Sequence, residues 1–344
     1  MAIPYGWVFT ILTVAGAVFP ATVSCLYVDT GNPYDPGKLQ VSSFVLTSIP
    51  DGIPKRAVVY HPTEPGDYAV MFFVPGLGGF VPSFLYDNFL ANVSTHGYIV
   101  ASSAWFVPTF GQDTKSRLPT FGRDMDSPSG KGIMSLFPEE DGEDNLKASR
   151  SDTYWKVLIW LQENLATVLS SRAPGVQARF DHLGLSGHSA GAGEIYSIMM
   201  RNTSLAQAAV FIEPANRVPE PIDFYLPGLM FGTEYGEETP ACNGQGFDFR
   251  QNYENWQCPR AMSNVKGFGH CDIMSPLGWN LCRLVNFCKT VPETDLTKYH
   301  MFLQGYTAAF YGTYLQNNGD MLKYVTDQDR IPIEFLEFKT DVNC

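Results

Sequence analysis

One five-residue motif, Gly187-His188-Ser189-Ala190-Gly191, constrains the fold of this chain more than any other feature. It follows a short apolar segment, residues 182–186, that is typical of a buried strand, and it precedes residues 192–200, whose pattern indicates a helix. A serine in G-x-S-x-G at a strand-to-helix junction is the pattern of a nucleophile elbow, in which a sharp turn raises the serine Oγ above the edge of a sheet. The motif therefore predicts Ser189 as a nucleophile, with an incidental serine in a glycine-rich turn as the alternative.

Apolar segments alternate with helical patterns along most of the chain. The expected strands are short, apolar runs at residues 56–60, 68–74, 98–102, 182–186, 208–212 and 228–232. Helical patterns between and after them cover residues 84–95, 151–170, 192–200 and 300–315. This alternation is typical of a mostly parallel sheet with helices on both faces. Together with the elbow it predicts the α/β class and an α/β-hydrolase fold.

The chain shows no break in composition and no internal repeat, which favours a single domain over residues 26–344. Within it, the polar stretch at about residues 107–149 is rich in glycine and proline. Long insertions of this kind in a compact domain are usually either functional or disordered. We expect this one to form a lid or a wall of a substrate pocket, with a surface loop as the alternative.

The first residues have the pattern of a secretory signal peptide. Residues 7–21 are almost wholly apolar and are followed by small residues, although no Lys or Arg precedes them. We therefore expect residues 1–25 to be removed and the protein to be secreted, with an uncleaved membrane anchor as the alternative. Sequons at Asn92 and Asn202 are compatible with glycosylation on that route.

Cysteine usage agrees with an oxidising compartment. Beyond residue 25, an even number of cysteines lies in the last third of the chain: Cys242, Cys258, Cys271, Cys282, Cys288 and Cys344. Such a set predicts three disulfides, and the sequence neighbours Cys242 with Cys258 and Cys282 with Cys288 are the local expectation. Zinc binding is the alternative, but the spacings lack a C-x2-C pair.

Composition and charge limit the classes of function. The chain is 45% hydrophobic and 17% charged, as a globular protein with a large core should be. Its formal net charge of −12 argues against nucleic-acid binding, which needs clustered Lys and Arg. The same charge gives no attraction to anionic membranes, and we interpret it as favouring solubility. No obligatory protein partner is indicated.

A serine nucleophile requires a base, which is usually a histidine held by a carboxylate. In the α/β-hydrolase fold the order along the chain is serine, acid, histidine. His270 lies in Gly267-Phe268-Gly269-His270, after a last strand expected at residues 265–269. We predict His270 as the base. His300, expected at the start of a helix as a surface or capping residue, is the alternative.

Two carboxylates compete for the role of the acid. Glu213 ends the strand at residues 208–212, and Glu234 ends the strand at residues 228–232. The end of either strand can reach the base in this fold, and Asp223 is a weaker option. The residues alone leave Glu213 and Glu234 open.

Two backbone N–H groups are candidates for the oxyanion hole. Ala190 begins the helix after the elbow, where its N–H faces the developing oxyanion. The second donor is expected from Gly76-Leu77-Gly78-Gly79, after the strand at residues 68–74, and we choose Leu77. A phosphate-binding loop is the alternative, but it lacks G-x-G-x-x-G and a following Lys. Neither a metal nor an organic cofactor is expected.

Several blocks resemble the chlorophyllases. Phe72-Phe73-Val74-Pro75-Gly76-Leu77-Gly78-Gly79 and Ser94-Thr95-His96-Gly97-Tyr98-Ile99-Val100 resemble the family's "FFHG…ASHGFIV" block, and platelet-activating-factor acetylhydrolases carry a similar one. Leu185-Ser186-Gly187-His188-Ser189 matches "LSGHS", and Gly269-His270-Cys271-Asp272-Ile273-Met274 is similar to "GHxDM". The resemblance covers roughly residues 40–315.

The resemblance implies both the acid and the activity. Ile212-Glu213-Pro214 occupies the place of the family's Asp-Pro, so the resemblance makes Glu213 the acid of the triad. The implied activity is that of a carboxylic-ester hydrolase acting on a hydrophobic ester such as the phytyl ester of chlorophyll. The alternatives are a lipid or acetyl-ester hydrolase resembling platelet-activating-factor acetylhydrolase, and a non-catalytic binding protein with this fold. The family's Ser-Arg-Gly-Gly elbow is Ser189-Ala190-Gly191-Ala192 here.

Overall fold

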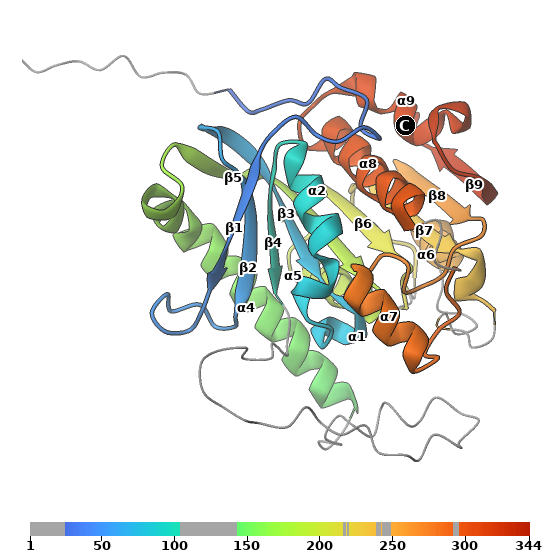
Figure 1. Cartoon of the computed structure of the whole chain (residues 1–344), viewed down its shortest axis with the longest axis horizontal. Helices are drawn as coiled ribbons and strands as arrows, with labels where there is room; N and C mark the ends of the chain where they lie inside the picture. The colour runs from blue at the N-terminus through green and yellow to red at the C-terminus, as the bar shows by residue number, and fades with distance from the viewer. Residues whose placement is uncertain are drawn as a thin grey trace, which may run out of the picture.

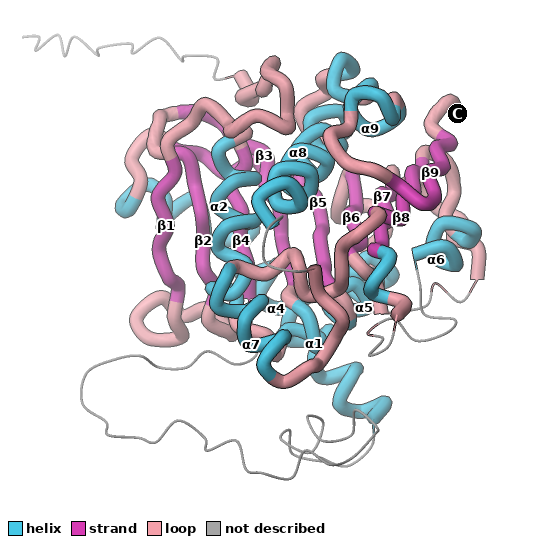
Figure 2. The backbone as a smooth tube through the Cα atoms, turned by 45° about the vertical axis from the view of Figure 1, so that its right-hand side comes forward, coloured by secondary structure: helices cyan, strands magenta, loops and turns pink. Residues whose placement is uncertain are grey.

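A mostly parallel sheet of nine strands forms the centre of the part of the chain that the computed structural model describes (residues 25–103, 143–215, 218, 220–238, 242, 249–291 and 296–344). The strand order is β1-β2-β4-β3-β5-β6-β7-β8-β9, which the labels of Figure 2 follow across the molecule. The strands are β1 (Val41–Leu46), β2 (Ala57–Pro62), β3 (Gly66–Val74), β4 (Tyr98–Ser103), β5 (Val176–His188), β6 (Ala208–Ile212), β7 (Gly228–Thr233), β8 (Arg260–Val265) and β9 (Phe335–Asp341).

The six strands β4, β3, β5, β6, β7 and β8 are parallel to their neighbours in this order. The antiparallel pairs lie at the two sides of the sheet, where β1 pairs with β2, β2 with β4, and β8 with β9. Because the carboxyl ends of parallel strands meet at one edge of a sheet, the loops after β3, β5, β6, β7 and β8 lie together there.

Helices cover both faces of the sheet, as Figures 1 and 2 show. The longer ones are α2 (Asp87–Thr95), α4 (Glu143–Arg172), α5 (Ala190–Arg201), α6 (Phe249–Asn255), α7 (Pro276–Leu284) and α8 (Leu296–Tyr314). The short ones are α1 (Gly76–Gly79), η1 (Ser83–Tyr86), η2 (Glu234–Gly236), η3 (Gly319–Met321), α9 (Lys323–Thr326) and η4 (Gln328–Arg330). Of the helices in the described ranges, none has the length and apolarity needed to cross a bilayer.

The core consists of two apolar layers, one on each face of the sheet. Along β3, Met71 and Phe73 join the layer that includes α2 and α8, whereas Val70 and Phe72 join the layer that includes α4 and α5. Successive strand residues point to opposite faces, so a strand covered on both sides must be apolar throughout. This explains why β3 is an unbroken apolar run in the sequence.

The structure confirms the α/β class, and each strand expected from an apolar run is present. Three strands were not expected or were misplaced. The edge strands β1 and β9 are partly exposed and polar, so they lack an apolar run. The strand expected at residues 265–269 is β8, which ends at Val265, where the expected strand begins.

Two sequence predictions concern segments that lie wholly or largely outside the described residues. The proposed signal peptide, residues 1–25, is described only at Cys25, which is exposed and unpaired with another cysteine. The insertion at about residues 107–149 was expected to end before a helix at residues 151–170. That helix, α4, instead begins at Glu143, so the last residues assigned to the insertion are helical.

Three disulfides are present, as predicted, but both local pairings were wrong. The pairs are Cys242–Cys288, Cys258–Cys344 and Cys271–Cys282, with Cα–Cα distances of 5.6, 6.1 and 6.4 Å. These distances lie in the range that a disulfide requires. The pairing follows the sheet, because β9 lies antiparallel to β8 and its end therefore returns to the start of β8, next to Cys258.

Candidate active site

Ser189 occupies a strained turn between β5 and α5. Its backbone has φ 55° and ψ −130°, a conformation that non-glycine residues rarely adopt, and the residue is 8% exposed. A Cβ at Gly187 would lie 2.5 Å from the Gly191 carbonyl oxygen, and a Cβ at Gly191 would lie 2.3 Å from the Val74 carbonyl oxygen. Both glycines of the motif are therefore required, since their neighbours are backbone atoms that no side-chain rotation can move.

Gly191→Ala is expected to separate the start of α5 from the turn after β3. Its methyl group would also lie 2.4 Å from the Pro75 carbonyl oxygen, so the backbone must shift. We expect a loss of about 1–3 kcal/mol in the free energy of unfolding, the usual cost of overpacking. Chemical denaturation measures this loss. Gly319→Ala is the matched control, because a Cβ there meets no atom within 4 Å. Equal stability of both variants would contradict the packing argument.

Glu213 and His270 form a buried pair. The Glu213 carboxylate Oε2 lies 3.4 Å from His270 Nδ1, and the two residues are 0% and 3% exposed. Glu213 follows β6 and His270 lies in the turn after β8, so two strand ends bring them together. A proton on Nδ1 facing the carboxylate leaves His270 Nε2 unprotonated, which is the state that a general base requires.

Backbone hydrogen bonds tie the serine to the acid. The Ser189 N–H donates to the Ile212 carbonyl at 3.0 Å, and the Ala215 N–H donates to the Ser189 carbonyl at 3.1 Å. The residues on both sides of Glu213 are therefore hydrogen-bonded to the Ser189 backbone. Within the described part of the chain, Ser189 Oγ forms no hydrogen bond with His270. Such bonds are often long before substrate binds.

The structure assigns other contacts to the competing residues. Glu234 Oε2 accepts a hydrogen bond from the Gly267 N–H at 2.7 Å, so its carboxylate holds the turn that precedes the base. Asp223 is exposed. His300 was expected as a surface or capping residue, which is wrong: it is half-buried within α8, and its Nε2 lies 2.7 Å from the Asp272 carbonyl oxygen. A sequence pattern cannot reveal that contact, because it joins helix α8 to the turn after β8, 28 residues earlier in the chain.

The two candidate oxyanion donors lie on elements that pack together. Leu77 is part of a left-handed turn with φ 54° and ψ 36°, and Ala190 is the first residue of α5. The first N–H groups of a helix have no partner within the helix, so Ala190 can donate to a ligand. The close approach of Gly191 to Val74 and Pro75 seats the start of α5 against the Leu77 turn.

Backbone strain is concentrated in the predicted site. In the described ranges five non-glycine residues have positive φ: Leu77, Ser189, Glu213, Asn286 and Asn317. Asparagine tolerates this region, whereas leucine, serine and glutamate do so at a cost of about 1–3 kcal/mol each. The three strained residues are a candidate oxyanion donor, the candidate nucleophile and the candidate acid. Glu213, directly after β6, has φ 47°.

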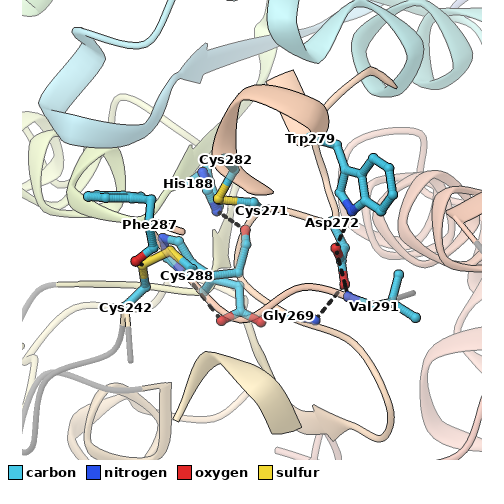
Figure 3. Close-up of a disulfide and its surroundings, with 12 residues drawn as sticks. His188, Cys242, Gly269, Cys271, Asp272, Trp279, Cys282, Phe287, Cys288 and Val291 are labelled. Carbon is cyan, nitrogen blue, oxygen red and sulfur yellow. Dashed lines mark hydrogen bonds and ion pairs between the residues drawn. A yellow bond between two sulfur atoms is a disulfide. The ribbon is translucent and has the colours of Figure 1, made fainter. Parts of the chain in front are cut away.

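Asp272 was not singled out from the sequence, although it lies in the block that contains His270. Figure 3 shows its carboxylate among three N–H donors, namely Gly269 N at 2.7 Å, Trp279 Nε1 at 2.9 Å and Val291 N at 3.1 Å. Burial raises the pKa of Asp272 to about 7; the hydrogen bonds oppose this rise and the charge of Glu213 adds to it. Asp272 therefore holds the loop on both sides of the base.

The raised pKa of Asp272 predicts a pH-dependent stability. The folded state binds this proton more tightly than the unfolded chain, so stability is highest at low pH and falls as the pH rises toward about 7. Between pH 5 and pH 8 we expect this group to remove about 2–3 kcal/mol from the free energy of unfolding. Urea denaturation of the parent and of Asp272→Asn at both pH values measures this. Asp272→Asn should be less stable than the parent, but its free energy of unfolding should not show this fall between pH 5 and pH 8. A fall of the same size in the variant would contradict the assignment to Asp272.

Two disulfides lie next to the base. Cys271, which follows His270, is bonded to Cys282 of α7, and the Cys242–Cys288 disulfide lies beside it (Figure 3). The sulfurs of Cys271, Cys282 and Cys288 lie within 4.8 Å of one another, a spacing that would suit a metal ion. Because all three are in disulfides, this cluster offers no thiolate to a metal while the bonds are intact.

Comparison with known proteins finds similarity to chlorophyllases over most of the chain. A family model described as Chlorophyllase matches residues 29–116 and 134–341. Chlorophyllase-2 of Arabidopsis thaliana is 21% identical over 313 residues, which cover 83% of this chain and 86% of that protein. Chlorophyllase type 0 of Chenopodium album is 21% identical over 243 residues, which cover 64% of this chain and 60% of that protein.

Proposed function

Because this chain belongs to the chlorophyllase family and is an ester hydrolase of that kind, we propose that it is a serine carboxylesterase with the triad Ser189, His270 and Glu213. The observation that carries this proposal is the buried pair of His270 Nδ1 and the Glu213 carboxylate, whose loop is bonded to the strained Ser189 turn. A base held by a carboxylate beside a serine at an elbow is the arrangement that activates the hydroxyl.

The reaction proceeds through an acyl-enzyme. Ser189 Oγ attacks the carbonyl carbon of the ester while His270 Nε2 takes the hydroxyl proton. The C–O bond to the alcohol then breaks, and His270 returns that proton to the leaving alkoxide. Water, deprotonated in turn by His270, attacks the acyl carbon. The bond between that carbon and Ser189 Oγ then breaks, the acid leaves, and His270 returns the proton to Ser189 Oγ. Glu213 holds the imidazole and stabilises the imidazolium.

The Leu77 and Ala190 N–H groups are the proposed donors to the oxyanion. Negative charge develops on the carbonyl oxygen in both tetrahedral intermediates, and donors fixed in advance need no reorganisation. Each donor of this kind contributes about 3 kcal/mol to transition-state stabilisation. The left-handed turn at Leu77 and the seating of α5 against it support this assignment. No metal or organic cofactor takes part in this scheme.

We propose a hydrophobic ester as substrate, with the phytyl ester of chlorophyll first among them. The names of the two relatives support this choice. A lipid or acetyl ester of the kind that platelet-activating-factor acetylhydrolases cleave is the alternative within the same mechanism.

The three disulfides support the further proposal that the protein is secreted, since such bonds persist in oxidising compartments.

A fluorophosphonate probe tests the proposal directly, because it reacts only with an activated serine. We expect one adduct by intact mass, and peptide mapping should locate it on Ser189. A panel of chlorophyll a, long-chain esters and acetyl esters then ranks the substrates. A folded protein that forms no adduct and cleaves no ester would overturn the proposal and leave a non-catalytic binding protein as the better reading.

A further inference from the structure

We infer that His188 and Tyr86 are positioning residues that fix the oxyanion turn and the base relative to one another. This inference rests on the proposed esterase function. The two residues form a buried chain of three hydrogen bonds from Gly76, at the start of the oxyanion turn, to the backbone of His270. His188 is the second residue of the elbow motif, and the proposed reaction gives it no role.

The direction of each hydrogen bond follows from its partners. The Gly76 N–H donates to Tyr86 Oη at 3.1 Å, so the Tyr86 hydroxyl proton is available for His188 Nδ1, which lies 2.9 Å away. At the other end, His188 Nε2 lies 3.1 Å from the His270 carbonyl oxygen, which can only accept. His188 therefore carries its proton on Nε2 and accepts at Nδ1.

The surroundings of His188 keep it neutral. It is fully buried, and burial together with the nearby His270 lowers its pKa well below the usual range. The hydroxyl of Tyr86 is also buried, which raises its pKa and keeps its proton in place. A protonated His188 would have no acceptor atom, so the Tyr86 hydroxyl proton would lose its partner in this chain. A neutral His188 satisfies each group along the chain.

The same ring also contacts the base directly. The His188 and His270 rings lie with centroids 4.5 Å apart and planes at 37°. During the proposed reaction His270 becomes an imidazolium, and the neighbouring ring is then neutral and adds no charge repulsion. A neutral aromatic ring beside a cation is also a favourable contact. His188 thus limits rotation of the base through its ring and sets the position of the His270 backbone through Nε2.

This arrangement matters because two separate loops must meet the same carbonyl group. In the proposed reaction the Leu77 N–H donates to the carbonyl oxygen of the ester, whereas His270 accepts the serine proton and gives it to the leaving alcohol. An error of about 1 Å between such groups can cost about 100-fold in rate. The chain Gly76–Tyr86–His188–His270 joins the two loops through hydrogen bonds of fixed geometry, so it holds the distance that the reaction uses.

Three variants separate the hydrogen bonds from the shape of the ring. His188→Phe keeps an aromatic ring and removes both bonds, Tyr86→Phe removes only the hydroxyl, and His188→Gln retains one acceptor and one donor. With a short nitrophenyl ester, we expect His188→Phe and Tyr86→Phe to lower kcat by about 10–100-fold with KM nearly unchanged. His188→Gln should recover part of the loss. The double variant should be no worse than His188→Phe, because both act on one chain.

Matched controls isolate this effect from general destabilisation. Tyr98→Phe removes a hydroxyl hydrogen bond from another fully buried tyrosine, at the opposite edge of the sheet, and His182→Gln changes a histidine in the middle of β5. Both should retain the parent kcat. The inference would be overturned if folded His188→Phe and Tyr86→Phe kept a kcat within about twofold of the parent. It would also be overturned if the loss of kcat in all variants and controls simply followed the fall in melting temperature.

The state of His188 can be tested without any activity. Imidazole ¹⁵N spectra of the parent, assigned with His188→Gln, should show His188 as the neutral Nε2–H tautomer. An Nδ1–H tautomer, or a protonated ring at neutral pH, would contradict the hydrogen-bond chain. If the parent forms no fluorophosphonate adduct, the esterase proposal fails first. If it forms the adduct but the spectra or the Phe variants disagree, only this inference fails.

Discussion

Ser189→Ala is expected to lower kcat for ester hydrolysis by about 10⁶-fold and to abolish the fluorophosphonate adduct. Losses of this size follow removal of the nucleophile from a serine-hydrolase triad, because the base and the acid then have nothing to activate. The fold should remain intact, since the Ser189 backbone rather than its hydroxyl bonds to Ile212 and Ala215. Hydrolysis rates and the mass of the treated protein measure both effects. Residual activity of more than about 1% would place the nucleophile elsewhere.

The acid can be tested with a matched pair of variants. Glu213→Gln should lower kcat by about 10⁴-fold, because the amide cannot hold the tautomer of His270 that leaves Nε2 free. Glu234→Gln should have little effect, since its amide oxygen can still accept from the Gly267 N–H. These two carboxylates are the ones that the residues alone left open. A larger loss in Glu234→Gln than in Glu213→Gln would exchange their roles.

The central part of the fold was predictable because burial on both faces forces an apolar strand. β3, β4 and β6 are fully or almost fully buried, and each was visible as an apolar run. The edge strands were not visible, because β1 and β9 are paired on one side only and partly exposed. The disulfide pairing was also beyond local reasoning. Cys258 and Cys344 are 86 residues apart, and only the pairing of β8 with β9 brings them together.

The candidate site could be derived from the sequence where the proposed chemistry requires a residue at a fixed place in the chain. Ser189 follows from two glycines that the turn needs, and His270 from its place after a strand. The contacts between loops were not predictable: Asp272 binds N–H groups from Gly269 and from Val291, nineteen residues away. The resemblance to chlorophyllases drew attention to the block around His270, but only the structure shows what the Asp272 carboxylate binds.

The disulfides should differ in what their removal costs, one mainly in stability and the other in activity. Removing Cys258–Cys344, which spans 86 residues, should cost about 4–5 kcal/mol of folding free energy, whereas removing Cys271–Cys282, which spans 11 residues, should cost about 3 kcal/mol. The first bond lies at the junction of β8 and β9, so the protein that still folds should hydrolyse esters normally. The second bond holds the residue after His270 to α7, so its loss should lower kcat in the folded protein.

Double serine variants of each pair, studied by denaturation and by the rate per fluorophosphonate-reactive site, separate the two effects. Counting reactive sites removes the unfolded fraction from the rate. We expect the double variant Cys258→Ser with Cys344→Ser to be the less stable of the two. Its rate of ester hydrolysis per reactive site should equal that of the parent. Cys271→Ser with Cys282→Ser should be the more stable of the two and about tenfold slower, because a less firmly held base is aligned with the reacting atoms for a smaller share of the time. If both variants kept the parental rate, the bond beside His270 would serve the fold alone, and the position of the base would depend on Asp272 and His188.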